Sequence, residues 1–306
     1  MRTLFFFLLI SIAISGQAQK ANLALNLEKG KEYRQNMTMK SAVNQDLEGQ
    51  KINMELSSKA SMTYLVKDID ERGYIFDVKF DSIIMSMNTP YGVFEFSSEK
   101  NEPSNVFSAM LAAMKNKSFE ITMAKTGKVI EIKNVDDLFD AAISELDLMQ
   151  ISEEQKEQTK AQVMKAYGAD AFRGNTEMVT AIFPENPVNI WDRWVVNTKL
   201  ESGMSGKITT DYELSDQTSG YYIIKGKSTI VTEDKDAYIE SNGMPMKFDI
   251  KGSMESEIKV DKKTGWIIEA KTNQELSGDA YIKENPQVPN GMKVPISMRT
   301  IATVAN

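Results

Sequence analysis

The chain of 306 residues contains no cysteine and no histidine. The lack of cysteine excludes disulfides, thiolate metal ligands, cysteine nucleophiles and the acylated cysteine that anchors a lipoprotein. The lack of histidine excludes a Ser-His-Asp triad and zinc or iron sites of the usual imidazole kind. We therefore expect no metal and no other cofactor, and we regard a non-catalytic role as better supported than an enzymatic one.

Basic residues are fewer than acidic ones, 36 against 43, and neither sign forms a long block. The net charge of −7 would become −8 if Arg2 were removed with the N-terminal segment described next. This balance argues against nucleic acid and against an anionic membrane surface as partners.

The longest uncharged apolar run lies at the N-terminus, from Leu4 to Ile14. It is too short to span a bilayer, but it fits the apolar core of a signal peptide. Gly16 and Ala18 match the small residues that signal peptidase prefers, so we expect residues 1–18 to be removed and the mature chain to begin at Gln19. This predicts a periplasmic or secreted protein that is neither lipid-anchored nor membrane-spanning.

Strands are predicted wherever apolar residues recur at every second position, which is the pattern of a sheet with one buried face. Such one-sided alternation favours antiparallel pairing. The predicted strands are Tyr33 to Met39, Ile52 to Val66, Tyr74 to Phe80, Trp194 to Leu200, Ile208 to Leu214, Tyr222 to Ile230, Met246 to Val260, Trp266 to Thr272 and Ile296 to Val304.

The period changes to that of a helix in the middle of the chain. Ser104 and Asn134 are each placed to cap a helix with one apolar face. Ser152 begins a capping-box sequence, and Gly168 would end the helix that follows it. A last short helix is expected from Met178 to Phe183.

These segments predict one β-rich module of 288 residues after the signal peptide. Its parts would be a first β half with one helix at 19–134, a helical segment at 135–187 and a second β half at 188–306. The expected fold class is α+β and mainly β: a strongly curved antiparallel sheet made of two related halves, with the central helical segment packed on one face because both have apolar faces to cover.

The two β halves contain similar sequences. The segment from Glu120 to Lys133 resembles Glu257 to Lys271, with eight of fourteen aligned positions identical around a shared Lys-Thr-Gly turn. Tyr64-Leu65-Val66 running to Gly73-Tyr74-Ile75 is echoed by Tyr212-Glu213-Leu214 running to Gly220-Tyr221-Tyr222. Convergent hairpins could produce one such match, but two matches in the same order favour an internal repeat, with Gly127 and Gly265 in equivalent turns.

Three further motifs support a resemblance over nearly the whole mature chain: Leu27 to Tyr33, the Lys-Thr-Gly turn at Gly127, and Phe183-Pro184 followed by Pro187-Val188 and Trp194. With them the chain resembles an uncharacterised family of exported proteins, common in Bacteroides-like Gram-negative bacteria and known only as a domain of unknown function. In the family pattern a glycine stands where this chain has Trp191. The resemblance implies no catalytic residue.

Two catalytic readings have some sequence support. Lys-Thr-Gly together with Ser-x-x-Lys at Ser97 and at Ser256 matches part of the penicillin-binding signature, but the third element is missing and neither serine begins a helix. A carboxylate-based hydrolase needs only two acids, yet the acids clustered at Asp68 to Glu71 and at Asp234 to Asp236 are better explained as solvated loops.

Methionine is unusually frequent, with 19 residues. Because methionine is flexible and polarisable, a sheet face rich in it can adapt to an irregular apolar ligand. The alternative explanation is that the methionines only fill the core. The candidate ligand-lining residues, all at inward strand positions, are Met37, Met39, Met54, Met62, Met85, Met246, Met254 and Met298.

The preferred function is therefore non-catalytic binding of a lipid or other apolar or amphipathic envelope ligand between sheet and helices. The architecture looks like the half-open barrels of periplasmic lipoprotein carriers, which is an analogy of fold only. The alternatives are an envelope scaffold or interaction module with a filled core, and a hydrolase that uses two carboxylates. Trp194 and Trp266 are expected in the core, whereas Trp191 is the tryptophan expected at the surface.

Overall fold

The structure is a computed structural model. It describes residues 20–306, with the exception of 101–104, 149–151, 202–204, 242–243 and 287. The expected signal peptide, residues 1–18, and the expected mature N-terminus at Gln19 lie outside the described residues.

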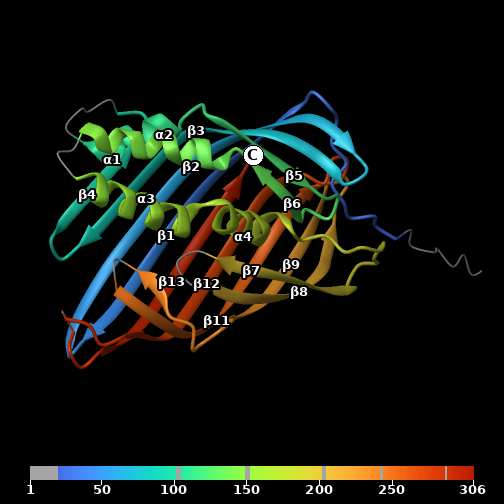
Figure 1. Cartoon of the computed structure of the whole chain (residues 1–306). Helices are drawn as coiled ribbons and strands as arrows, with labels where there is room; N and C mark the ends of the chain where they lie inside the picture. The colour runs from blue at the N-terminus through green and yellow to red at the C-terminus, as the bar shows by residue number, and fades with distance from the viewer. Residues whose placement is uncertain (1–19, 101–104, 149–151, 202–204, 242–243, 287) are drawn as a thin grey trace, which may run out of the picture.

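Long strands lie on both sides of a segment in the middle of the chain that contains the helices (Figure 1). The strands are β1 Glu32–Leu47, β2 Gln50–Asp70, β3 Gly73–Thr89, β4 Gly92–Ser97, β5 Ser118–Met123, β6 Val129–Lys133, β7 Arg193–Glu201, β8 Ser205–Gln217, β9 Tyr221–Thr232, β10 Ile239–Ser241, β11 Met244–Asp261, β12 Ile267–Ile282 and β13 Met292–Ala305. The helices are α1 Val106–Met114, α2 Val135–Ser144, α3 Glu153–Tyr167 and α4 Ala169–Thr180, with a 3₁₀ turn, η1, at Glu145–Leu148.

All thirteen described strands form a single antiparallel sheet, in the order β6-β5-β3-β2-β1-β13-β12-β11-β9-β8-β7. Strand β4 pairs with β3, and β10 pairs with β11. The first and last strands, β1 and β13, pair in the centre of the sheet. Strands β6 and β7 are consecutive in the sequence but lie at opposite edges of the sheet. The chain between them must therefore cross from one edge to the other.

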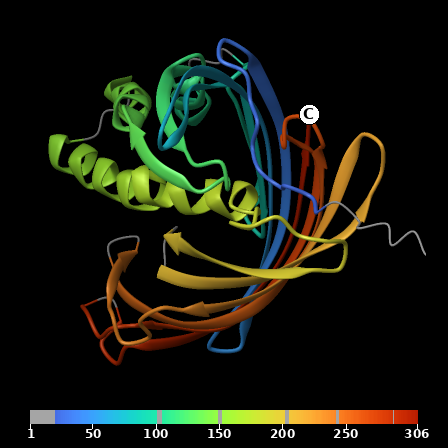
Figure 2. The same cartoon turned by 90° about the vertical axis from the view of Figure 1, so that its right-hand side faces the viewer.

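The sheet is strongly curved, and the helices lie on its concave side (Figure 2). In each strand, alternate residues point to this inward face, and residues paired across strands share a face. The expected fold class, a curved antiparallel sheet with a central helical segment packed on one face, is confirmed. Among the described residues, no helix is long and apolar enough to cross a membrane.

The main hydrophobic core lies between the helices and one part of the inward face. Leu138, Phe139 and Leu146 belong to the same buried cluster as Met62, and Met110, Met114 and Phe80 pack against it. These are contacts that the sequence predicts. The apolar helix stripe and the strand alternation predict the same contacts for Leu111 and Met54, but among the described residues neither belongs to an apolar cluster.

The N-terminal segment closes one end of this core. Ala21, Leu23, Leu25 and Leu27 are buried at alternate positions. The segment also connects the two Lys-Thr-Gly turns, because the Leu25 N–H donates to the Lys125 carbonyl at 2.8 Å and the Asn26 N–H donates to the Thr264 carbonyl at 2.8 Å.

The two β halves share their strand order and their irregularities. In the β2–β3 hairpin Val66 pairs with Phe76 and the register shifts directly after Val66, while in the β8–β9 hairpin Leu214 pairs with Ile224 and the register shifts directly after Leu214. The hairpins β5–β6 and β11–β12 also contain matching shifts, before Met123 and before Val260.

This register corrects one detail of the expected repeat. Tyr74 pairs with Met123, and Tyr222 pairs with Val260. Tyr74 therefore corresponds to Tyr222 and not to Tyr221, which stands one residue earlier. Gly127 and Gly265 do occupy equivalent turns, with φ of +84° and +68°. Superposition of the whole halves stays a prediction.

The starts of α1 and α2 differ in detail from the expected ones. Helix α1 is capped by Asn105, whose side chain accepts from the Ser108 N–H, while Ser104 lies outside the described residues. Asn134 stands at the start of α2, but its side chain makes no capping bond.

The capping box at Ser152 and the end of α3 at Gly168 are confirmed. The expected short helix from Met178 to Phe183 is instead the longer α4, which begins directly after Gly168 and ends at Thr180. The following Ala181, Ile182 and Phe183 are buried but belong to no helix or strand.

Phe139 tests the packing of the helical layer. It is 5% exposed in the main core, so Phe139→Ala should lower the free energy of unfolding by about 3 to 5 kcal/mol. Phe107→Ala, in the same layer at a site 57% exposed, should cost less than about 1 kcal/mol. Equal costs in chemical denaturation would contradict this packing.

The repeated glycines test the turns. A Cβ at Gly127 would lie 1.7 Å from the Thr180 carbonyl oxygen, and one at Gly265 would lie 2.1 Å from the Ala24 carbonyl oxygen. Gly30 has a similar φ of +80° but open space around it. Gly30→Ala should therefore cost about 1 to 2 kcal/mol for backbone conformation alone, while the other two variants should cost about 1 to 3 kcal/mol more because of overpacking. Three equal losses in a urea titration would show that these turns are not tightly packed.

Candidate functional site

The candidate site is the inward face of the sheet, where cross-strand pairing brings apolar side chains from distant segments together. Met39 on β1 pairs with Ser58 on β2 and with Ala302 on β13, and Ser58 pairs with Met85 on β3. These residues form one row across four neighbouring strands, β3, β2, β1 and β13. Met39 is 38% exposed and Met85 is 39% exposed, although both side chains point inward.

A second row of inward side chains lies four residues farther along β1, at Val43. Val43 pairs with Met54 on β2 and with Met298 on β13, and Met298 pairs with Leu276 on β12. Leu276 belongs to a small buried cluster with Met254 and three isoleucines, against which Met298 packs. This part of the face is therefore partly filled by its own side chains.

The register places all eight candidate methionines on the inward face, but it does not gather them at one point. Met62 and Met254 are buried in separate clusters, and Met37 packs against the first of these. Met246 lies at the far end of β11, opposite Ile282. Met39 and Met85 combine an inward position with an exposed surface, and the lining role of the whole set stays a prediction.

Buried hydroxyl pairs lie between the two apolar regions. Ser41 and Thr300 share a hydrogen bond of 2.8 Å, and Thr210 and Ser228 share another of 2.8 Å. Because each hydroxyl finds its partner within the sheet, this band is satisfied without a ligand. The period-2 pattern predicts that these positions face inward but does not reveal that they are polar partners.

Phe94 and Phe96 on β4 add to the exposed part of the inward face. Phe94 pairs with Met87 and Phe96 pairs with Met85. Phe94 is 42% exposed, and Phe96 contacts Phe107 of α1 with ring centroids 5.1 Å apart. Sequence reasoning missed β4, although the alternation of Val93 to Phe96 could have revealed it.

Helix α4 covers both ends of the sheet. On the β6 side, Glu177 Oε1 accepts from the Val129 N–H at 2.9 Å, and Thr180 Oγ1 donates to the Gly127 carbonyl at 2.7 Å. On the β7 side, Gly174 lies so close that a Cβ would be 2.6 Å from the Lys199 carbonyl oxygen. These residues were not predicted, because their roles depend on two strands distant in sequence.

Burial raises the pKa of Glu177, and the Val129 N–H and the charges of Lys128 and Arg173 oppose that rise. Glu177 lines a hollow of about 680 Å³ between α4 and β7. Its carboxylate is engaged with the backbone of β6 at the short distance given above, so we interpret it as a structural contact that holds α4 on the sheet.

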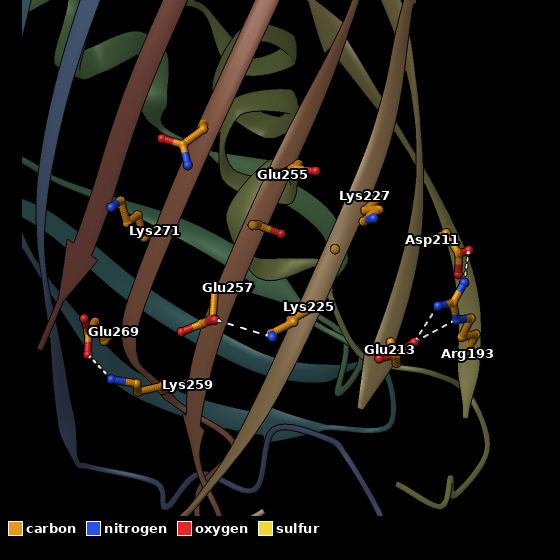
Figure 3. A pocket seen from close by; sticks show the side chains of 13 residues that line it. Arg193, Asp211, Glu213, Lys225, Lys227, Glu255, Glu257, Lys259, Glu269 and Lys271 are labelled. Atoms are coloured by element: carbon orange, nitrogen blue, oxygen red, sulfur yellow. Dashed lines mark hydrogen bonds and ion pairs between the residues drawn. The ribbon is translucent and has the colours of Figure 1, made fainter. Parts of the chain in front are cut away.

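A charged hollow of about 710 Å³ lies on the outer face of β7, β8, β9, β11 and β12 (Figure 3). Its cations and carboxylates pair across strands, including Lys259 with Glu269 at 2.6 Å and Arg193 with Glu213 at 2.7 Å. Such pairing is typical of a solvated antiparallel face.

The acids considered for hydrolysis are engaged elsewhere. A hydrogen bond from Lys29 lowers the pKa of Asp68, and one from Arg72 lowers the pKa of Asp70, whereas a general acid needs a raised pKa. Asp234 accepts from the Asp236 N–H in a turn. Within the described ranges, no group of three or more acidic side chains is placed to hold a metal ion.

The tryptophans lie where the sequence predicts. Trp266 is 4% exposed and packs against Tyr33 and Tyr64 at 5.0 and 5.4 Å between ring centroids. Trp194 is half-buried, and its indole N–H donates to the Ile182 carbonyl at 2.9 Å. Trp191 is 68% exposed with φ of +73°, a conformation that glycine adopts without strain.

Comparison with protein families shows that residues 71–267 match the model of a family of unknown function, DUF6263. The chain belongs to this family. The DUF6263 match spans both sides of the helical segment, from the β2–β3 turn to the start of β12. A comparison with curated proteins found no match.

Among solved structures, the DUF6263 chain is similar in fold to one described as "Lipid-protein interactions in lipovitellin", with a TM-score of 0.50 and 9% identity over 92% of this chain and 25% of that one. The chain thus spans about a quarter of that protein's length. An outer membrane channel from Pseudomonas putida F1 aligns over 92% of this chain and 97% of its own, with 7% identity and a TM-score of 0.24. The second score is too low to support an inference.

Glu177 gives a testable pH dependence. An acid whose pKa is raised by folding binds its proton more strongly in the folded state, so its contribution to stability falls as the pH rises above its ordinary value of 4.5. Glu177→Gln keeps an oxygen acceptor for Val129 without the buried charge. The stability of this variant relative to the native chain should therefore improve between pH 4 and pH 7.

The control is Glu177→Ala, which leaves the Val129 N–H without its acceptor and should cost about 1 to 3 kcal/mol. Thermal unfolding at several pH values measures both effects. A relative stability of Glu177→Gln that does not change with pH would contradict the account.

Proposed function

We propose that this protein is an exported, non-catalytic cell-envelope protein that binds a lipid or other apolar or amphipathic ligand on the inward face, between sheet and helices. The observation that carries the proposal is the exposure of Met39, Met85 and Phe94. Large apolar side chains that point into a curved sheet and still contact water indicate a surface that a ligand can cover.

The chemistry of these residues suits a ligand of irregular shape. Methionine changes rotamer at low cost and has a polarisable sulfur, so Met39 and Met85 can adjust to acyl chains of different length. The row also contains the small residues Ser58 and Ala302, which leave space between the methionines. Lipovitellin, which shares the fold, is described in terms of lipid–protein interactions, and this supports an apolar ligand.

Export is part of the proposal and depends on the apolar run from Leu4 to Ile14 and the cleavage site before Gln19. The periplasm or the exterior would then be the place where the ligand is met. Sequencing of the N-terminus of protein isolated from the envelope should find Gln19, and an intact Met1 would contradict export by this route.

A second candidate is an envelope interaction module with a filled interior. It is favoured by the core beneath α2 and α4, where Phe76, Ile121 and Ile182 are fully buried. The two candidates differ at the row of Met39 and Met85, which should stay accessible to water in an interaction module and become covered by lipid in a binding protein.

Native mass spectrometry of protein purified from its own envelope distinguishes them. We expect a fraction of the protein to carry one lipid-sized adduct, and the double variant Met39→Asn, Met85→Asn to lose most of it because the amides must be desolvated by the ligand. The matched control is Val231→Asn with Ile301→Asn, which are 39% and 42% exposed at outward positions of β9 and β13. An adduct that is absent from the native protein, or lost equally in both double variants, would refute binding at the inward face.

A further inference from the structure

Helix α1 is unusual for a helix at the surface of the molecule. Its nine residues, Val106–Met114, include no charged side chain, and among them only Ser108 is buried. A helix that is apolar on all sides is normally enclosed by a core or by a membrane. Here its apolar side chains are left partly or largely exposed, with Phe107 at 57%.

The neighbouring β3–β4 hairpin exposes large apolar side chains on both of its faces. Tyr91 in its turn is 83% exposed, Val93 is 64% exposed on one face, and Phe94 is 42% exposed on the other. Phe107 joins them through its contact with Phe96. We call Tyr91, Val93, Phe94 and Phe107 the hairpin patch. Through Met87, opposite Phe94, and Met85, opposite Phe96, the patch is continuous with the inward face.

Addition of a partner strand along the whole of β4 does not explain this surface, because the free edge is already engaged at Glu95 and Ser97. The Asn105 side chain donates to the Glu95 carbonyl at 3.3 Å, and the Ser97 N–H donates to Ser108 Oγ at 3.0 Å. Side chains and not backbone groups are therefore what the patch offers. A tyrosine at the tip, with an apolar ring and a polar hydroxyl, suits the boundary between lipid tails and headgroups.

The charges at the border of the patch indicate which lipid surface fits. Glu95 pairs with Lys100 at 3.9 Å, and Glu99 pairs with Lys115 at 2.8 Å, so each acidic group is balanced by a lysine. The net charge of the chain, −7, would also repel an anionic membrane. A surface of zwitterionic headgroups avoids this repulsion.

We propose that the hairpin patch docks the protein on a zwitterionic lipid surface, so that an apolar ligand passes between that surface and the inward face. This inference rests on the proposed function, because the patch matters for transfer only if the inward face takes a ligand. Docking would bury Tyr91, Val93 and Phe107 among the headgroups and upper acyl chains.

Sedimentation with vesicles of phosphatidylcholine and phosphatidylethanolamine tests the docking. The protein should begin at Gln19, since the apolar run of residues 4–14 would bind vesicles by itself. We expect Tyr91→Ser, Val93→Ser, Phe107→Ser to lower the apparent partition coefficient by roughly tenfold or more. The matched control is Trp191→Ser, Val195→Ser, Ile301→Ser, which removes side chains 68%, 60% and 42% exposed elsewhere and should bind within about twofold of the native chain.

Binding should also survive 0.5 M salt, because it does not depend on charge attraction. Absence of vesicle binding by the native chain, equal losses in the two triple variants, or binding only to anionic vesicles at low salt would each overturn the proposal. So would a dimer, seen by light scattering, that only the patch variant abolishes, since a second copy would then be the occupant. Vesicle binding without a lipid adduct in native mass spectrometry would leave docking in place and refute the ligand site, while the reverse result would refute docking alone.

Discussion

The structure depends on one topological constraint: the two outermost strands of the sheet, β6 and β7, are consecutive strands of the chain. A curved antiparallel sheet that does not close leaves two edges with unpaired backbone groups, and natural proteins cover or pair such edges. Here the connection itself supplies the cover. Helices α2, α3 and α4 carry the chain across the concave side, and α4 reaches both edges through Glu177, Thr180 and Gly174. The helices therefore lie over the inward face because of the order of the strands.

This arrangement also divides the inward face into two environments. Under α2 and α4 the side chains of both halves meet in one core, where Phe76 and Trp266 lie 6.4 Å apart between ring centroids. Outside this core, Met39 and Met85 on the same face remain more than a third exposed. A packed core stabilises one fixed arrangement, whereas flexible methionines at its boundary tolerate several. The proposed binding surface is thus the exposed part of the inward face at the boundary of this core.

Much of this architecture could be predicted from sequence, and the failures have physical reasons. The alternation in Ile52 to Val66 reports a one-sided strand directly, and Ser152 with Gln155 forms the expected capping box. The start of α4 was missed because Gly168 both ends α3 and precedes the next helix, a boundary that apolar periodicity does not show. The same pattern predicts that Met62 and Met85 face inward, but whether each is buried depends on how far the helices reach, which is a property of tertiary packing.

The repeat shows a related limit. Sequence similarity finds the Lys-Thr-Gly turns, yet only the structure shows that both turns bind the same N-terminal segment, through the Lys125 and Thr264 carbonyls. Backbone carbonyls carry no residue signature, so this function of the turns is invisible in the sequence. Trp191 has a backbone φ of +73°, which few residues other than glycine adopt easily, and the glycine that the family resemblance implies at this position would adopt it without strain.

The central claim, that the inward face beside the helices is an accessible surface which a lipid covers, is tested most directly by methionine oxidation. Limited peroxide treatment followed by peptide mass spectrometry should oxidise Met39 and Met85 well before Met62 and Met254, whose exposed fractions are 4% and 6%. After equilibration with a lipid extract of the native envelope, oxidation of Met39 and Met85 should slow. The oxidation of a methionine-containing peptide, added to the sample as an internal standard, should stay constant. Unchanged oxidation of both residues in the presence of lipid would contradict the claim.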